Sequence, residues 1–221
     1  MAPRDDERDH VSPVGRMAPG ASKVPPPKMT YEEFLEWADE DTHAEWVNGE
    51  VVYMSPVSRA HQRVTLFLAA LMQHLLERRG LGGLILAGPF QMKTGPDLPG
   101  REPDVIYIAG DHVERCQPNH LRGPGDLVVE VISPESRTRD RVEKLSEYEE
   151  GGVREYWLID PVRKQAEFHV LGEDGRYRRQ AVEEDGVYRS RVLEGFWIRL
   201  EWLFRETPPP LLDVLKEWGI V

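Results

Sequence analysis

The chain has 221 residues, and its 28 basic and 39 acidic side chains give a formal net charge of −11. That length fits one domain with at most an appendage. The single cysteine excludes a disulfide framework and a zinc site built from several cysteines. No apolar run approaches the roughly 20 residues of a membrane-spanning helix, and the N-terminus lacks the apolar stretch of a signal peptide, so we expect a cytoplasmic protein without a membrane contact. The acidic charge argues against nucleic-acid binding by charge alone, although bound cations supply positive charge locally.

The two ends of the chain differ in composition from its middle. Residues 1–28 hold six of the 18 prolines and show no apolar periodicity, so we expect a disordered, proline-rich tail there. Residues 29–205 are expected to form the folded domain. Residues 206–221 contain a proline-rich linker, followed by the pattern of a short amphipathic helix over 211–218.

The folded part is predicted to begin with a helix and a hairpin. Thr30, with Glu33 three residues later, fits a capping box and marks the helix start. The apolar residues of this helix are Phe34, Leu35 and Trp37. Next, Asn-Gly at 48–49 lies between the short apolar runs 43–46 and 51–54, which is a strong hairpin signal.

Two longer helices are predicted further along the chain. Ser58 is placed to cap the first, and Gly80 to end it. Apolar residues recur on one of its faces at helical spacing, at Val64, Leu68, Leu71 and Leu75. The second helix is expected over 139–150, before Gly151-Gly152.

The remaining apolar runs predict strands. They lie at 84–93, 104–109, 127–133 and 155–160, followed by antiparallel strands at 167–171, 176–182 and 187–190. The runs at 104–109 and 127–133 are almost continuously apolar, which is typical of strands buried on both faces. The order of elements predicts an α/β (α+β) fold, with helices packed on a mixed sheet.

A carboxylate in the middle of one of these strands is the main anomaly. Glu130 lies inside the run LVVEVI, and Asp104 opens another run directly after Pro103. Burying a carboxylate is expensive unless it is paired or bound to a metal ion. If the two strands are neighbours, the two carboxylates converge on an oxygen-lined site suited to Mg²⁺ or Mn²⁺. The alternative is a structural ion pair between Glu130 and an Arg or Lys.

Six sequence blocks widen this pattern. They are EWVNGEV at 45–51, MSP at 54–56 with His61 after it, EPDV at 102–105, VEVISP at 129–134, Asp140 with Lys144, and GVREYWLIDP at 152–161. In this order they resemble the Uma2 family (also called DUF820), restriction-endonuclease-like proteins of the PD-(D/E)XK nuclease superfamily. The resemblance covers about residues 29–205.

The resemblance implies a fold and an activity. The implied fold is a restriction-endonuclease-like mixed central sheet flanked by helices, here with additional antiparallel C-terminal strands. The implied activity is that of an endonuclease, which hydrolyses phosphodiester bonds in nucleic acid with Mg²⁺ or Mn²⁺. The expected substrate is DNA, and the expected assembly is a homodimer.

The lysine of the superfamily motif is displaced in this chain. The motif places it two residues after the Glu, where this chain has Ile132. In sequences similar to Uma2, a lysine of the next helix is thought to substitute, and Lys144 is the matching residue. A lysine side chain is long enough to reach across from a packed helix. The alternative is an ordinary i, i+4 pair between Lys144 and Asp140 on a solvated helix face.

The resemblance also assigns roles to residues. Asp104 and Glu130 would hold the metal ion with the Val131 carbonyl as a further ligand, and Lys144 would assist the attacking water. Glu45 is expected to reach the same metal from the facing side, or to be a strand-edge carboxylate. Substrate contacts are expected from His61, Arg139 and Tyr148, for which a helix surface or core packing are the alternatives.

Two further hypotheses come from other classes. A catalytically degenerate nuclease fold would act as a binding or regulatory module, as the displaced lysine and the acidic charge allow. A structural dimer would pack its C-terminal helix on a partner, although that helix can equally cover its own domain.

Overall fold

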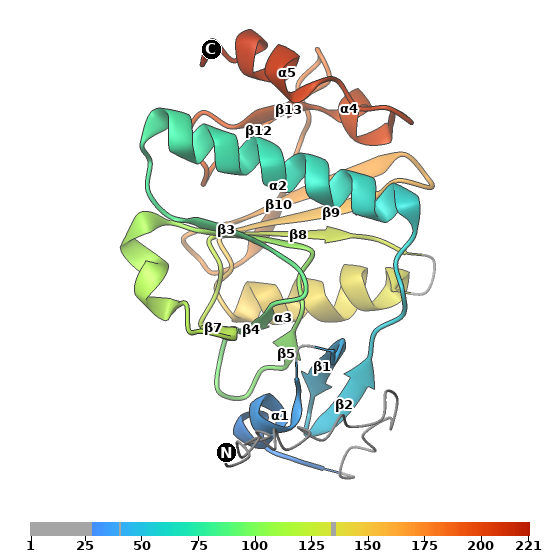
Figure 1. Cartoon of the computed structure of the whole chain (residues 1–221), viewed down its shortest axis with the longest axis vertical. Helices are drawn as coiled ribbons and strands as arrows, with labels where there is room; N and C mark the ends of the chain where they lie inside the picture. Colours follow the sequence, from blue (N-terminus) through green and yellow to red (C-terminus); the bar gives the residue numbers. More distant parts are fainter. Residues whose placement is uncertain (1–27, 40, 134–135) are drawn as a thin grey trace, which may run out of the picture.

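The computed structural model describes residues 28–39, 41–133 and 136–221. The predicted tail, apart from Lys28, lies outside the described residues. The described chain is built around a large mixed sheet, with helix α2 (Arg59–Arg79) on one face and helix α3 (Lys144–Glu150) on the other (Figure 1). The mixed sheet flanked by helices confirms the predicted fold class.

The large sheet has six strands. In order of pairing they are β11 (Tyr177–Gln180), β10 (Gln165–Leu171), β9 (Glu155–Asp160), β8 (Leu127–Val131), β6 (Val105–Ile108) and β3 (Leu84–Ala87). Only β8 and β9 pair in parallel; the other neighbours are antiparallel. All residues of β6, β8 and β9 are buried, which confirms the prediction of strands covered on both faces.

Successive side chains of β6 and β8 point to opposite faces of the large sheet and so belong to two separate hydrophobic cores. Odd-numbered residues such as Val105 and Val129 pack with the apolar face of α2. Even-numbered residues such as Ile106 and Val128 pack with Tyr148 of α3. Because side chains alternate across a strand, Glu130 belongs to the α3 face.

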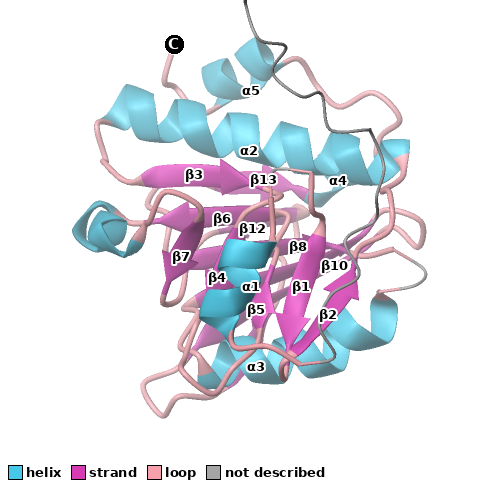
Figure 2. Cartoon of the chain, turned by 60° about the horizontal axis from the view of Figure 1, so that its bottom comes forward, coloured by secondary structure: helices cyan, strands magenta, loops and turns pink. Residues whose placement is uncertain are grey.

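A smaller sheet lies beside the large one. Its five strands pair in the order β2 (Glu50–Tyr53), β1 (Ala44–Val47), β5 (Gly100–Arg101), β4 (Gln91–Lys93) and β7 (His120–Arg122). Helix α1 (Tyr31–Trp37) packs on it, as Figure 2 shows. The predicted hairpin is confirmed: β1 and β2 meet at Asn48 and Gly49, both with positive φ, as a two-residue hairpin turn requires.

Helix starts and stops follow the predicted signals. Thr30 and Glu33 form the capping box of α1 in both directions. The Ser58 side chain accepts from the His61 backbone N–H at the start of α2, and Gly80 ends that helix in the left-handed conformation.

Three predictions about elements need correction. The single strand expected over 84–93 is divided between β3 and β4, which belong to different sheets, because Pro89 interrupts the run and cannot donate to a ladder. The helix expected over 139–150 begins as a π-helical turn, Arg139–Glu143, before α3. Strand β12 (Val187–Arg189) leaves the large sheet and pairs with β13 (Trp197–Arg199), which the sequence reading missed, as it missed β5 and β7.

The chain ends in two short helices, α4 (Leu200–Phe204) and α5 (Leu211–Glu217). Val214 and Leu215 of α5 and the following Trp218 join the hydrophobic core to which the apolar face of α2 belongs. The C-terminal helix thus covers its own domain.

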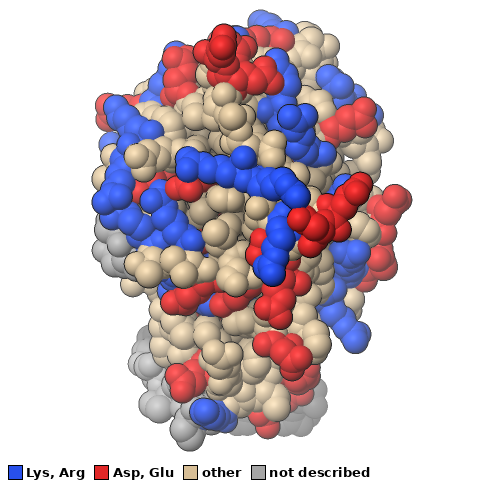
Figure 3. Space-filling model, turned by 180° about the vertical axis from the view of Figure 1, so that it is seen from behind, with Lys and Arg blue, Asp and Glu red and all other residues tan. Residues whose placement is uncertain are grey.

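The described residues contain no helix that is both long and apolar enough to cross a membrane. On the face seen in Figure 3, acidic and basic side chains lie next to one another. The charges on this face therefore largely offset each other.

Candidate active site

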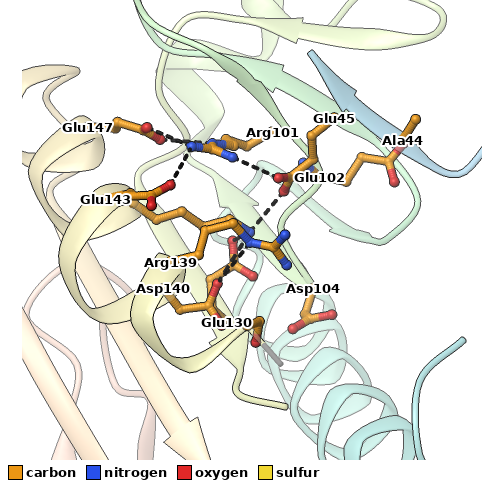
Figure 4. Close-up of polar contacts among 12 residues, drawn as sticks. Ala44, Glu45, Arg101, Glu102, Asp104, Glu130, Arg139, Asp140, Glu143 and Glu147 are labelled. Carbon is orange, nitrogen blue, oxygen red and sulfur yellow. Dashed lines mark hydrogen bonds and ion pairs between the residues drawn. The ribbon is translucent and has the colours of Figure 1, made fainter. Parts of the chain in front are cut away.

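Segments from the two larger sheets and from helices α2 and α3 meet where β8 ends and β6 begins, at one end of these interior strands of the large sheet. Asp104 directly precedes β6, Glu130 lies near the end of β8, Glu45 is on β1, and Lys144 begins α3. A pocket of about 390 Å³ opens here, and its wall includes Asp104, Glu130, Asp140, Lys144, His61 and Arg139. Figure 4 shows most of these side chains converging from their separate elements.

Lys144 lies at the centre of the cluster and is 1% exposed. Its Nζ is 2.8 Å from Glu130 Oε1, 2.9 Å from Glu45 Oε1 and 3.7 Å from Asp140 Oδ1. Burial alone would lower the pKa of Lys144, but the charges of Glu130, Glu45 and Asp140 raise it well above its ordinary value. Lys144 is therefore a buried ammonium, and the alternative of a solvated i, i+4 pair is wrong.

Glu130 is 5% exposed and accepts two hydrogen bonds, both at Oε1. One comes from Lys144 and the other from the Tyr148 hydroxyl, each at 2.8 Å. Burial raises the pKa of Glu130 to about 8: the nearby Lys144 lowers it, while the neighbouring carboxylates of Asp140 and Asp104 raise it further. A strand interior therefore holds a carboxyl group whose ionised form needs more positive charge than Lys144 supplies.

Glu45 is fully buried between two cations, Lys144 and Arg101. Arg101 Nη1 lies 2.8 Å from Glu45 Oε2, and the other side of the guanidinium bonds Glu147 of α3 at 2.6 and 2.8 Å (Figure 4). Burial would raise the pKa of Glu45, but Lys144 and Arg101 lower it to about 2. Glu45 faces these cations and does not belong to the pocket wall.

Asp104 is held from two sides. Its Oδ1 lies 2.7 Å from His61 Nε2, and its Oδ2 accepts the Val131 backbone N–H at 2.6 Å. Asp104 thus connects the start of α2 to the end of β8 and contributes an oxygen to the pocket.

The remaining predicted substrate contacts differ in position. Arg139 lines the pocket, and its Nε is 3.9 Å from Asp140 Oδ1. Tyr148 is 1% exposed and lies behind Glu130, outside the pocket wall.

Comparison with known proteins places these residues in a family. The family model described as "Uma2: Putative restriction endonuclease" matches residues 31–201. The chain belongs to the Uma2 family.

Solved structures show the same fold. A crystal structure titled as a "putative nuclease belonging to DUF820" from Anabaena variabilis ATCC 29413 matches with a TM-score of 0.65 and 14% identity, covering 80% of this chain and 97% of that one. No curated protein matches the chain.

The donor set of this Uma2 chain suits a hard cation. Within the described residues, no three His, Cys, Asp or Glu side chains are grouped closely enough to hold a metal ion by themselves. Mg²⁺ usually needs only one or two carboxylates, with waters and substrate phosphates completing its coordination. Asp104 and Glu130 meet that requirement, and the like charges that raise the pKa of Glu130 are what a cation would relieve.

Sequence reasoning missed Arg101, and it named Asp140 only as the neighbour of Lys144 and not as part of the candidate site. Arg101 ties the small sheet to α3 and is 2% exposed, and Asp140 is a buried member of the carboxylate cluster. Asp140 Oδ1 is buried without a hydrogen-bond partner. The available signal for Arg101 was its position beside the EPDV block, because a charged residue next to a buried strand is often paired.

Proposed function

We propose that this chain is a metal-dependent endonuclease that hydrolyses phosphodiester bonds of nucleic acid, with Mg²⁺ or Mn²⁺ held by Asp104 and Glu130. The observation that carries the proposal is the buried cluster in which three carboxylates, those of Glu130, Glu45 and Asp140, share Lys144 beside one pocket. Membership of a family described as putative restriction endonucleases supports the substrate class.

The proposed metal ligands are Asp104, Glu130 and the Val131 carbonyl. A divalent ion bound there lowers the pKa of its water and stabilises negative charge on the phosphate. Both hydrogen bonds to Glu130 use Oε1. Its Oε2 is thus left for a ligand.

Lys144 supplies positive charge next to the reacting phosphate. Because three carboxylates hold it as an ammonium, it stabilises developing negative charge and orients the water, and it does not take up the water's proton. Although Lys144 does not occupy the lysine position of the sequence motif, its Nζ lies 2.8 Å from Glu130 Oε1 in the folded chain.

Other residues act by positioning these groups. Glu45 and Arg101 fix Lys144 against α3, Tyr148 fixes Glu130, and His61 fixes Asp104. We assign Arg139 to contact with a phosphate, since it lines the pocket and its closest carboxylate is 3.9 Å away.

The first test is calorimetric titration of Mn²⁺ into the wild type and the Asp104→Asn/Glu130→Gln variant. We expect binding to be lost in the variant, together with cleavage of plasmid and oligonucleotide DNA in Mn²⁺. Asp174→Asn/Glu183→Gln is the matched control, because it removes two carboxylates that are about half exposed, outside the pocket. If the wild type neither binds Mn²⁺, alone or with DNA, nor cleaves any substrate, the result contradicts the endonuclease and favours the catalytically degenerate binding module.

The homodimer remains a proposal, and sedimentation of the full chain tests it. A monomer at micromolar concentration contradicts it.

A further inference from the structure

A second cavity shares a wall with the candidate active site. It has a volume of about 380 Å³, and its wall includes Gln62, Thr65, Gly88 and Pro89, which do not line the first pocket. The segment 54–57, Glu102, His61 and Asp104 line both the first pocket and this one. Whatever enters the second cavity is therefore next to the group bound at Asp104.

The charge of this cavity does not suit a phosphate. Its wall contains no Lys or Arg, and two of its residues, Glu102 and Asp104, are acidic. Like charges repel at short range, so a phosphate is disfavoured there. Arg139 and Lys144, by contrast, line only the first pocket.

The cavity offers apolar surface with a few hydrogen-bonding groups. Met54, Pro56, Val57 and Pro89 supply the apolar part, and Gln62 and Thr65 of α2 supply amide and hydroxyl groups. This composition is typical of sites that bind a flat, uncharged ligand with polar edges.

Two buried polar atoms at this wall have no partner in the described structure. They are His61 Nδ1 and Thr65 Oγ1, one helical turn apart, on residues that are 7% and 6% exposed. Buried polar groups are normally hydrogen-bonded, so an unpaired pair beside a cavity points to a ligand that carries donors and acceptors.

We infer that the second cavity binds the nucleobase of an unpaired nucleotide next to the scissile phosphate, so that the preferred substrate is single-stranded nucleic acid. A base has the flat apolar faces and polar edges that this wall matches, and it enters such a cavity only when it is unstacked and unpaired. The inference rests on the proposed function, since the first pocket must hold the adjoining phosphate.

The test is fluorescence anisotropy of the full chain in Ca²⁺ with a labelled single-stranded oligodeoxynucleotide, the same sequence as RNA, and its perfect DNA duplex. We expect at least one single strand to bind about tenfold more tightly than the duplex. The comparison of DNA and RNA shows which sugar the site accepts. Equal or tighter binding of the duplex overturns the inference.

Matched variants of α2 place the effect in the cavity. Gln62→Trp fills the cavity mouth and is expected to weaken single-strand binding about tenfold. Leu66→Trp makes the same change one turn further on, at a side chain that is 61% exposed and outside the cavity, and should bind as the wild type does. Thr65→Val, which keeps the shape of the side chain, gives a second test if Gln62→Trp does not fold. Unchanged binding by folded Gln62→Trp and Thr65→Val overturns the inference.

Cleavage in Mn²⁺ separates this inference from the proposed function. If the single strands and the duplex are cleaved equally, and Gln62→Trp does not change this, the result contradicts base binding in the cavity but is consistent with the proposed endonuclease. Single-strand binding that depends on Gln62, without any cleavage, supports the cavity and contradicts the endonuclease.

Discussion

Two buried glutamates on adjacent strands have opposite surroundings. Glu130 of β8 is 5% exposed and Glu155 of β9 is fully buried. Glu155 accepts five hydrogen bonds of 2.7–2.9 Å from uncharged donors, which are the side chains of Trp157, Tyr188 and Ser190 and the backbone N–H groups of Arg191 and Val192. Glu130 accepts two, from Lys144 and Tyr148, among three further carboxylates.

The difference shows what a buried carboxylate indicates. The donors around Glu155 satisfy its charge and tie residues 188–192 to the large sheet, which is a structural task. The neighbours of Glu130 leave excess negative charge beside a pocket, which is the usual arrangement of a site that binds a cation or shifts a pKa. Burial alone does not separate these two cases, but the signs of the neighbouring charges do.

The largest effect is expected at the structural glutamate. Glu155→Ala leaves two backbone N–H groups and three side-chain donors without their acceptor, so we expect the free energy of unfolding to fall by about 4 kcal/mol or more. Urea unfolding measures this loss. Mn²⁺ affinity of the protein that remains folded should be unchanged, and a loss of metal binding without unfolding would contradict the structural role.

Acid should destabilise the folded chain by protonating Glu45. Its pKa is lowered to about 2 in the folded chain from an ordinary value of 4.5, so the unfolded chain takes up this proton first as the pH falls. The stabilisation is complete above about pH 4.5 and is lost as the pH falls towards 2, by about 3 kcal/mol in all. Urea unfolding at several pH values measures it, and Glu45→Gln should flatten the profile in this window. An equally steep profile in Glu45→Gln contradicts the assignment.

Catalysis should depend on Glu130. Loss of the partners behind a ligand already reduces metal affinity or activity about 10–100-fold, so Glu130→Gln should reduce cleavage by more than about 100-fold. The fold should survive, because the amide keeps the shape and removes a repelled charge. Wild-type cleavage in this variant, with unchanged thermal unfolding, would contradict the site.

The sequence predicted those parts of the fold that depend on local signals. The capping box at Thr30, the Asn48-Gly49 turn and the Ser58 and Gly80 helix ends act within a few residues, and all are confirmed. Strands β5 and β7 have two and three residues and pair only with distant segments, so no local pattern reveals them.

The site was predicted in its residues but not in its connections. The sequence predicts a shared site for Asp104, Glu130, Lys144 and Glu45, and the structure brings these four side chains together. The role of Arg101 depends on Glu45 and Glu147, which are 56 and 46 residues away. Glu155 looks like Glu130 in the sequence, because both lie in apolar strands, and only the folded chain shows their different neighbours.

The smallest effect is expected when a single hydroxyl group is removed beside each of the two glutamates. Burial raises the pKa of Tyr148 well above its ordinary value, so its hydroxyl remains a donor to Glu130 at every working pH. Tyr148→Phe should weaken Mn²⁺ binding and reduce kcat about tenfold, as expected for a partner behind a ligand. Tyr188→Phe is the matched control, since that hydroxyl bonds Glu155 at the same 2.8 Å. It should lower the free energy of unfolding by about 1–2 kcal/mol and leave Mn²⁺ affinity unchanged. If both variants lose only stability, Tyr148 is a packing residue; if only Tyr148→Phe changes metal affinity, the two glutamates differ in function as their neighbours indicate.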